Sequence, residues 1–309
     1  MKKSITIATF ITSYEKKNEN FFSVVEFLSE DFDTEYFVFS DDGIIRNGSP
    51  LENQEVCKTK FKRIEKSLKL AKNDIILCID NDTIVDKENL KSFLQEAFER
   101  DFSLAWGKIG SQKIGGFIPN LIGIDKNLSH NIIRPFLWKM NIGISIPGQI
   151  FCINRTYFSG KLENYDTVFD DLTLGLICKK ENMPVFFSGL TLGYERPKGN
   201  FSELVRQRIR WAKGFSETLR YSKKMCTQRF VVLHGIVYHF LWILFFLFFV
   251  LSIYFNLEEI AILFLILLVL ILAKFSFRQL LFALCYIIIF PFIHIIWMIA
   301  LFNNLKAKP

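Results

Sequence analysis

Two carboxylates stand two residues apart at the end of a short apolar run. The stretch "ILCIDNDTIVDKENL", residues 76–90, places Asp80 and Asp82 on either side of Asn81. In a β-strand, residues two apart point to the same face, so the two carboxylates are expected to point together. Hard oxygen ligands of this kind select Mg²⁺ or Mn²⁺, often completed by substrate phosphates. We therefore predict a divalent cation at Asp80 and Asp82; a turn with a helix cap is the alternative.

A second acidic pair occurs in "VFDDLTLGL", residues 168–176. Asp171 could act as a general base that takes the proton of an acceptor hydroxyl. The alternative is that Asp170 and Asp171 only stabilise the start of a helix, where the helix dipole and the unpaired backbone amides favour negative charge.

The third group lies in "QRIRWAKG", where Gln207, Arg210 and Trp211 are spaced i, i+3 and i+4. On a helix this spacing presents an amide, a guanidinium and an indole on one face. Arginine suits oxyanions, and tryptophan suits the apolar face of a sugar ring or a membrane interface. An amphipathic interfacial helix with a tryptophan anchor explains the same pattern, and both descriptions are compatible.

The elements that must position these groups alternate between strand and helix over the first 100 residues. Strand-like runs at residues 4–12, 34–42 and 74–80 are separated by apolar residues at helical spacing. Asp86 is placed to cap the helix that follows the third strand. This alternation predicts a mainly parallel sheet, in which ligands bind beyond the carboxyl ends of the strands. Residues 101–200 are less regular, and the glycine-rich run 106–120 is predicted to be loop.

The last part of the chain is strongly apolar. Residues 230–255 contain no Asp, Glu, Lys or Arg, and residues 260–277 and 279–302 are two further apolar runs. A helix that crosses a bilayer needs about 20 such residues, so we predict about three transmembrane helices. Lysines and arginines crowd residues 213–229, which favours a cytoplasmic position for the preceding part.

Bulk properties exclude several classes of protein. The net charge of +7 comes largely from that juxtamembrane cluster, so a nucleic-acid partner is not expected. The six cysteines are scattered and form no C-x-x-C pair, which argues against a zinc site or a disulfide framework and fits a reducing compartment. The start "MKKSITIATFIT" has no small-residue cleavage site, and we interpret it as a first strand rather than a signal peptide.

Together, "SDDG" (40–43), "DND" (80–82), "FDDLTLGL" (169–176) and "QRIRW" (207–211), followed by apolar helices, resemble the membrane-bound branch of family 2 glycosyltransferases. This branch includes cellulose, hyaluronan and poly-N-acetylglucosamine synthases and ceramide glucosyltransferases. The resemblance implies an α/β fold of the GT-A type in residues 1–200, an interfacial helix in 201–228 and a membrane domain in 229–309.

The resemblance also implies an inverting, metal-dependent hexosyltransferase with Mg²⁺ or Mn²⁺ as cofactor. Asp42 would contact the nucleoside, Asp80 and Asp82 the metal, with Asp82 the more direct ligand, and Asp171 would be the catalytic base. Gln207 and Arg210 would face the diphosphate, and Trp211 the acceptor. The donor would be a nucleotide-diphosphate sugar and the acceptor a lipid or lipid-linked saccharide at the membrane.

Three other functions stay open from the sequence. A processive polysaccharide synthase, alone or with a partner subunit that supplies a channel, would use the same chemistry on a different product. A nucleotidyltransferase would release pyrophosphate and would leave the Q-x-x-R-W motif unexplained. A non-catalytic membrane scaffold would retain the fold without turnover.

Overall fold

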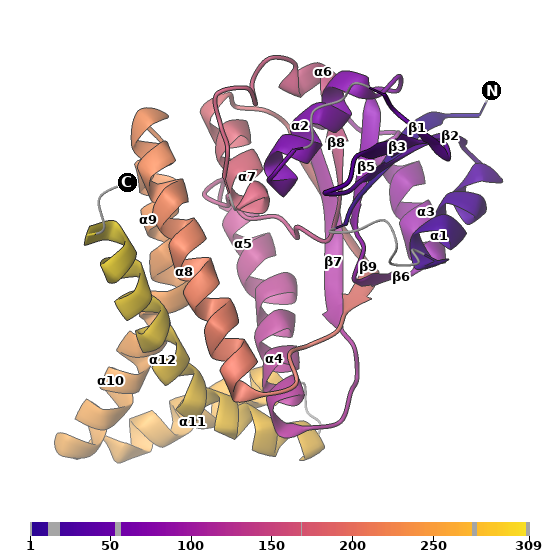
Figure 1. The fold of residues 1–309 in the computed structure, drawn as a ribbon. Helices are drawn as coiled ribbons and strands as arrows, with labels where there is room; N and C mark the ends of the chain where they lie inside the picture. Colours follow the sequence, from indigo (N-terminus) through magenta and orange to yellow (C-terminus); the bar gives the residue numbers. More distant parts are fainter. Residues whose placement is uncertain (1, 12–18, 53–56, 168, 274–276, 307–309) are drawn as a thin grey trace. The chain divides into compact units, whose positions relative to one another are not determined.

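The computed structural model describes residues 2–11, 19–52, 57–167, 169–273 and 277–306. The chain divides into two compact units. Unit 1 comprises residues 1–110 and 144–195, and unit 2 comprises residues 111–143 and 196–309. Figure 1 shows the elements of both units in sequence colours.

The described part of unit 1 is built on one nine-stranded sheet, in the order β4-β3-β2-β1-β5-β8-β7-β9-β6. Its strands are β1 (Ser4–Phe10), β2 (Asp33–Phe39), β3 (Ile44–Arg46), β4 (Ser49–Pro50), β5 (Ile75–Asp80), β6 (Thr83–Val85), β7 (Leu104–Ser111), β8 (Ile150–Asn154) and β9 (Val185–Glu195). Its helices are α1 (Glu19–Ser29), α2 (Lys60–Leu70), α3 (Lys87–Ala97), α6 (Arg155–Phe158) and α7 (Asp170–Lys180). In Figure 1, α1 and α3 lie on one face of the sheet and α2 and α7 on the other. The predicted alternation of strands and helices over the first 100 residues is confirmed.

The prediction of a mainly parallel sheet is wrong, because the sheet is mixed. Strands β2 and β5 each pair with β1 in parallel. Strand β8 lies between β5 and β7 and is antiparallel to both. Parallel neighbours need a crossover connection. The chain instead leaves unit 1 after β7 for residues 111–143 and re-enters the sheet as β8 in the opposite direction.

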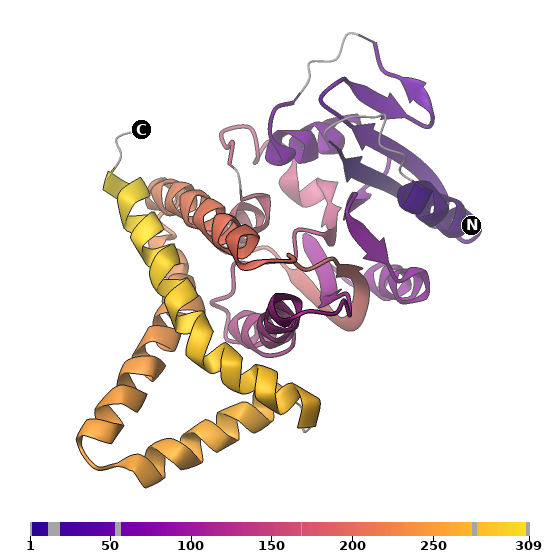
Figure 2. The ribbon, with the colours of Figure 1, turned by 60° about the horizontal axis from the view of Figure 1, so that its bottom comes forward.

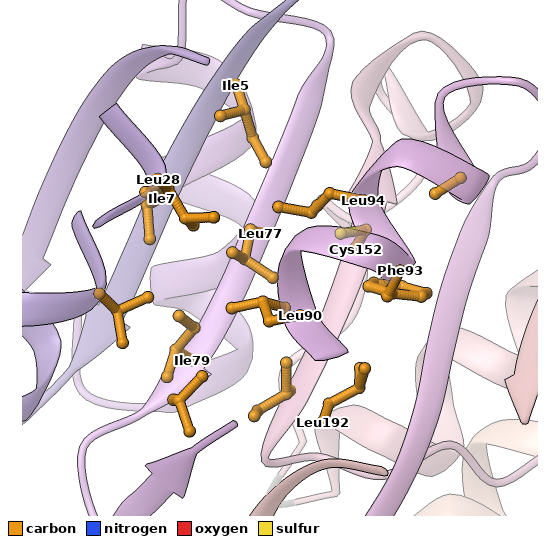
Figure 3. Packing of buried hydrophobic residues seen from close by; sticks show 14 of the residues in the cluster. Ile5, Ile7, Leu28, Leu77, Ile79, Leu90, Phe93, Leu94, Cys152 and Leu192 are labelled. Carbon is orange, nitrogen blue, oxygen red and sulfur yellow. The ribbon is translucent and has the colours of Figure 1, made fainter. Parts of the chain in front are cut away.

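The main core of unit 1 lies between this sheet and the pair α1 and α3 (Figure 3). Alternate residues of the central strands point into it, because side chains alternate between the two faces of a strand. The fully buried members include Ile5 and Ile7 of β1, Leu77 of β5, and Leu90 and Phe93 of α3. The same alternation turns the other residues of β1 and β5 toward α2 and α7, where the polar groups described below gather.

The glycine-rich run 106–120 is not the predicted loop, since β7 extends to Ser111 and a helix starts at Phe117. Two of its glycines lie inside β7 against the partner strand β9. A Cβ atom on Gly107 would lie 2.6 Å from the Leu192 side chain, and one on Gly110 would lie 2.6 Å from the ring of Tyr194. These glycines therefore permit close approach of two strands rather than a turn.

The described part of unit 2 is entirely helical. Its elements are α4 (Phe117–Leu128), the π-helical turn η1 (Ser129–Ile133), α5 (Arg134–Lys139), α8 (Phe201–Lys224), α9 (Gln228–Gly235), the π-helical turn η2 (Ile236–Phe240), α10 (Leu241–Tyr254), α11 (Glu258–Ala273) and α12 (Phe277–Lys306). A second hydrophobic core, which includes Leu121 of α4, Trp242 of α10 and Phe290 of α12, joins α4, α10, α11 and α12. Figure 2 shows α10, α11 and α12 as the three sides of a triangle.

Two helical stretches of unit 2 are long and apolar enough to cross a bilayer, Gln228–Tyr254 and Gln279–Lys306. They correspond to the predicted segments 230–255 and 279–302. The third predicted segment, 260–277, falls on α11 and includes residues 274–276, which lie outside the described part of the chain. The 16 residues of α11 are fewer than the roughly 20 that a span requires.

Candidate functional site

The acidic residues predicted to bind ligand gather at one edge of the sheet in unit 1. Strand β5 ends at Asp80, and Asp41 and Asp42 follow the end of β2. Because β2, β1 and β5 run parallel, both strand ends lie at the same edge. The prediction that Asp80 and Asp82 share one face of a strand is wrong, since Asp82 is an exposed residue of the turn between β5 and β6. The predicted cap of α3 by Asp86 is confirmed, with the Asn89 N–H donating to its carboxylate at 3.1 Å.

A lysine that the sequence analysis did not single out binds this acidic edge. The Lys60 Nζ lies 2.7 Å from an oxygen of Asp80 and 3.2 Å from an oxygen of Asp170. It also donates a hydrogen bond of 2.6 Å to the carbonyl of Gly148. Lys60 is the first residue of α2, which begins after the cap Thr59. Three segments far apart in the sequence therefore meet at one ammonium group.

Asp171 belongs to the same cluster. A Cβ atom on Gly148 would lie 3.6 Å from Cβ of Asp171, 3.7 Å from the Lys60 Nζ and 3.9 Å from an oxygen of Asp170. Helix α7 approaches closely here, because a Cβ on Gly175 would lie 1.9 Å from the carbonyl oxygen of Ile144. The first turn of α7 thus brings both acids of the "FDD" motif to the carboxyl end of β5.

The electrostatics of the cluster leave negative charge unbalanced. Burial alone would lower the pKa of Lys60, but Asp170 and Asp80 outweigh it and raise that pKa, so the ammonium stays charged. Burial raises the pKa of Asp80 to about 7; Lys60 opposes this shift, and Asp170 and Asp82 add to it. One ammonium therefore pairs with two carboxylates, those of Asp80 and Asp170.

The donor chemistry of this edge fits a hard divalent cation. Among the described residues, no three His, Cys, Asp or Glu side chains form a complete metal cage. Mg²⁺ and similar ions are held by one or two carboxylates with the remaining ligands from phosphate and water, so a full protein cage is not needed. The buried Oδ2 of Asp170 accepts no well-aligned hydrogen bond from the described part of the chain, although the Lys60 ammonium lies 3.2 Å from it.

Asp42 is exposed at the turn that follows β2, and its N–H donates to Ser40 at 3.2 Å. The adjacent Asp41 pairs with Arg63, a buried arginine of α2. Arg63 also donates to the carbonyl of Ile11 at 2.7 Å, so it ties the end of β1 to this turn. The arrangement fixes the backbone beside Asp42 and leaves its carboxylate accessible.

Lys60→Met is expected to destabilise the protein by about 1–3 kcal/mol, because it leaves the buried Asp170 and the half-buried Asp80 without their cation. The measurement is the thermal unfolding midpoint of the purified protein. Lys69→Met is the control in the same helix, since the Lys69 side chain is 53% exposed and its ion pairs with Glu65 and Glu163 are expected to contribute little to stability. Equal midpoints for the two variants would contradict the structural role of Lys60.

In unit 2, the Q-x-x-R-W motif lies on α8, as predicted. Asn200 caps this helix, accepting a hydrogen bond of 2.9 Å from the Glu203 N–H. Gln207 and Trp211 are half-buried, and Arg210 is exposed. All three lie on one helix, but they belong to a different compact unit from the acidic cluster.

The arginine inside the motif, Arg208, is buried and forms a network within unit 2. It donates to Asp125 of α4 at 2.6 Å, and the hydroxyl of Tyr286 of α12 donates to the same carboxylate at 2.9 Å. The Arg208 guanidinium lies 4.3 Å from the ring centroid of Trp211 and 5.7 Å from that of Phe290. This network fixes α8, the motif helix that carries Q-x-x-R-W, to α4 and α12.

Asp125→Ala is expected to cost about 3–5 kcal/mol, because it leaves the Arg208 charge buried without a partner. Tyr286→Phe removes one hydrogen bond and should cost about 0.5–1.5 kcal/mol. The double variant Asp125→Leu with Arg208→Met removes both charges and should recover much of the lost stability. Thermal unfolding in detergent measures the stability of all three variants. A double variant no more stable than Asp125→Ala would contradict the ion-pair explanation.

The comparisons with known proteins identify the family. Residues 75–305 match the family described as glycosyl transferase family group 2. The chain belongs to this family. The matched range contains Asp80, Asp82, Asp171 and the motif helix, whereas Lys60 and Asp42 precede it. No curated protein shows a significant match to the sequence.

Solved structures of two sugar-transferring enzymes resemble this chain in fold. The mannosyltransferase PcManGT from Pyrobaculum calidifontis, solved with GDP-Man and Mn²⁺, superimposes with a TM-score of 0.52 at 9% identity. The match covers 98% of this chain and 88% of that one. Glucosyl-3-phosphoglycerate synthase from Mycobacterium tuberculosis, solved with Mn²⁺, UDP and phosphoglyceric acid, gives a TM-score of 0.48 at 11% identity, covering 71% of this chain and 78% of that one. The family match and the similarity to the mannosyltransferase show that this chain has a GT-A-like α/β fold, with a mixed sheet.

Sequence reasoning missed two residues that hold these groups of side chains together, Lys60 and Arg208. Lys60 stands beside an apolar helical stripe, where lysine ordinarily lies in solvent. Arg208 occupies a variable position of the motif. The available signal for Arg208 was its spacing of four residues from the buried Leu204 and Ala212, which places it on the buried face of the helix.

Proposed function

We propose that this protein is an inverting, metal-dependent hexosyltransferase that moves a sugar from a nucleotide-diphosphate donor to a hydroxyl of a membrane-associated acceptor. Family membership supports the transfer chemistry. The observation that carries the proposal is the cluster of Asp80, Asp170 and Asp171 around Lys60 at the carboxyl end of β5. Ligands of open α/β sheets bind at this end.

The cation would be held by Asp82 and Asp80, with Asp82 the more direct ligand. When bound, the cation neutralises charge that develops on the departing nucleoside diphosphate. Lys60 forms ion pairs with Asp80 and Asp170. It orients the Asp80 carboxylate and reduces the repulsion between the acids of the cluster. Asp42 is assigned to the nucleoside of the donor.

Asp171 is assigned as the general base. It takes the proton of the acceptor hydroxyl as that oxygen attacks the anomeric carbon, while the bond from this carbon to the diphosphate oxygen breaks. Attack opposite the leaving group inverts the configuration. Asp171 suits this role because Lys60 offsets part of the negative charge of Asp80 and Asp170 beside it. The motif helix is assigned the remaining contacts, Gln207 and Arg210 with the diphosphate and Trp211 with the acceptor.

The membrane assignment rests on the two long apolar helices of unit 2 and on the basic residues that precede them. We place these helices in the bilayer and the catalytic unit on the cytoplasmic side, where lysines and arginines accumulate. An acceptor carried by the membrane follows from this arrangement.

The test is release of nucleoside diphosphate from a panel of nucleotide sugars by the purified protein in detergent, with and without a lipid extract. Release that depends on Mn²⁺ and increases with the extract is expected. The absence of turnover and hydrolysis across the panel would indicate a scaffold. Sizing the radiolabelled product separates a single transfer from processive synthesis.

A further inference from the structure

An amide and a carboxylate that have no role in the proposed reaction lie at the same edge of the sheet as the acidic cluster. The side-chain amide of Gln149, the residue before β8, donates a hydrogen bond of 2.8 Å to the carboxylate of Glu195, the last residue of β9. Both side chains are half-buried, and both residues belong to unit 1. The two residues are 46 positions apart in the sequence, so only the fold brings them together.

Gln149 is held beside the assigned base. Its backbone carbonyl accepts a hydrogen bond of 2.8 Å from the Asp80 N–H, which continues the pairing of β8 with β5 by one residue. The preceding residue, Gly148, faces the first turn of α7, since a Cβ atom on it would lie 3.6 Å from Cβ of Asp171. Gln149 therefore lies next to both Asp80 and the start of α7.

Glu195 is held beside the assigned cation ligand. In the antiparallel pairing of β6 with β9, its partner is Thr83, which directly follows Asp82. Directly opposed residues of antiparallel strands have Cα atoms about 4.5–5.5 Å apart, so Glu195 lies next to the turn that carries Asp82. The end of β9 also packs closely on the start of β8, because a Cβ atom on Gly193 would lie 3.0 Å from the side chain of Ile150.

The pair lies where the proposed reaction needs the donor sugar. The cation assigned to Asp82 would hold the diphosphate, and the acceptor oxygen activated by Asp171 attacks from the opposite side of the anomeric carbon. The sugar ring therefore lies between the turn of Asp82 and the first turn of α7. Glu195 is beside that turn and Gln149 is beside α7, so the pair flanks the ring. The nucleoside is assigned to Asp42, after β2, which β1 and β5 separate from β8.

The chemistry of the pair fits sugar hydroxyl groups. A carboxylate only accepts hydrogen bonds, whereas a primary amide has two donor hydrogens and an acceptor oxygen. Within the described part of the chain, the Gln149 amide makes one hydrogen bond, the one to Glu195. One amide hydrogen and the amide oxygen are therefore available to a ligand. A hydroxyl group can donate to the carboxylate, and a neighbouring hydroxyl can bind the amide.

The charge of this edge also limits the kind of sugar. Glu195 adds a carboxylate to an edge that already carries Asp80, Asp170 and Asp171, with Lys60 pairing the first two. A sugar that carries its own carboxylate would be repelled here, because like charges at close range disfavour each other. Discrimination between ligands can depend on such repulsion as much as on favourable contacts.

We propose that Gln149 and Glu195 bind hydroxyl groups of the donor sugar and select a neutral sugar over a uronic acid. The inference rests on the proposed function, because it names the residues that recognise the sugar of the donor and the class of sugar that they accept.

The test compares a nucleoside diphosphate with the nucleotide sugars built on it, by calorimetry with Mn²⁺ on the full chain in detergent. The probes are UDP, UDP-glucose and UDP-glucuronic acid, and GDP, GDP-mannose and GDP-mannuronic acid. The ratio of two dissociation constants isolates the sugar, because the nucleoside diphosphate contributes to both. The variants are Gln149→Met and Glu195→Gln. Glu96→Gln is the matched control, since Glu96 accepts a hydrogen bond of 3.1 Å from Ser188 of β9 but lies on α3, on the other face of the sheet (Figure 1).

The neutral nucleotide sugar is expected to bind about tenfold more weakly, relative to its nucleoside diphosphate, in Gln149→Met and Glu195→Gln than in Glu96→Gln and the unchanged protein. This is the loss expected for a hydrogen bond that involves a charged group. The affinity for the nucleoside diphosphate itself should not change. The unchanged protein should bind each neutral sugar at least about tenfold more tightly than the matching uronic acid, and Glu195→Gln should bring the two affinities close together.

Unchanged ratios in both variants, or equal affinities of the unchanged protein for the neutral sugar and the uronic acid, would overturn the inference. A parallel loss of affinity for the nucleoside diphosphate and the nucleotide sugar would also overturn it, because the pair would then only support the fold. Failure of the proposed function has a different sign: the unchanged protein would bind no nucleoside diphosphate with Mn²⁺ and release none from the donor panel.

Discussion

Asp171→Asn should lower the rate of sugar transfer by about 10²–10⁴-fold, the usual contribution of a positioned general base. Asparagine keeps the size of the side chain and can still accept a hydrogen bond from the Leu172 N–H, which now donates to Asp171 at 2.9 Å. Donor affinity should stay close to that of the unchanged protein, because Asp80, Asp82 and Lys60 are unaltered. Single-turnover transfer and equilibrium binding of UDP and GDP with Mn²⁺ measure the two effects separately.

The matched control for this substitution is Asp74→Asn. Asp74 lies just before β5, at the end of the strand opposite Asp80, and pairs with Arg155 while its side chain is 63% exposed. Its substitution removes the same charge and should leave both transfer and binding unchanged. If Asp171→Asn instead lost nucleotide binding in parallel with transfer, Asp171 would be a structural residue of α7 and not the base.

Local patterns explain why much of unit 1 was predictable. Strand β5 is a continuous apolar run that ends in a carboxylate, and the cap of α3 by Asp86 depends on residues only three apart. Each of these features is decided within about one helical turn or one strand. The position of Asp80 at the carboxyl edge followed from them, because β1 and β5 do pair in parallel.

Features that depend on distant segments were not predictable in the same way. The ion pair of Lys60 with Asp80 and Asp170 joins residues 20 and 110 positions apart. Nothing near Lys60 in the sequence distinguishes it from a lysine on the solvent face of an amphipathic helix. The mixed sheet has a similar origin, since β8 enters between β5 and β7 only after the chain has passed through residues 111–143.

Glycines gave a misleading signal for a physical reason. Gly107 and Gly110 suggested a loop because glycine weakens a strand. Their actual role is to let β7 approach the side chains of Leu192 and Tyr194. The residues that require the glycines belong to β9, more than 80 positions later in the chain, so only the three-dimensional structure separates the two explanations.

Asp82→Asn should remove the part of donor affinity that depends on the cation. Asp82 is exposed in the turn after β5, whereas Asp80 is already paired with Lys60, so Asp82 is the carboxylate better able to ligate a new cation. Replacing a residue that only supports a metal ligand lowers metal affinity by about 10–100-fold. Loss of the ligand itself should lower it by at least as much. The measurement is binding of UDP and GDP by calorimetry, with Mn²⁺ and with a chelator.

Asp42→Asn provides the comparison that isolates this effect. Asp42 is assigned to the nucleoside, so its substitution should weaken binding by a similar factor with Mn²⁺ and with the chelator. Asp82→Asn should instead leave the weak binding in chelator unchanged and abolish the increase that Mn²⁺ produces. If Asp82→Asn retained the full increase, the cation would be held elsewhere at this edge, and Asp80 and Asp170 around Lys60 would be the remaining carboxylates able to hold it.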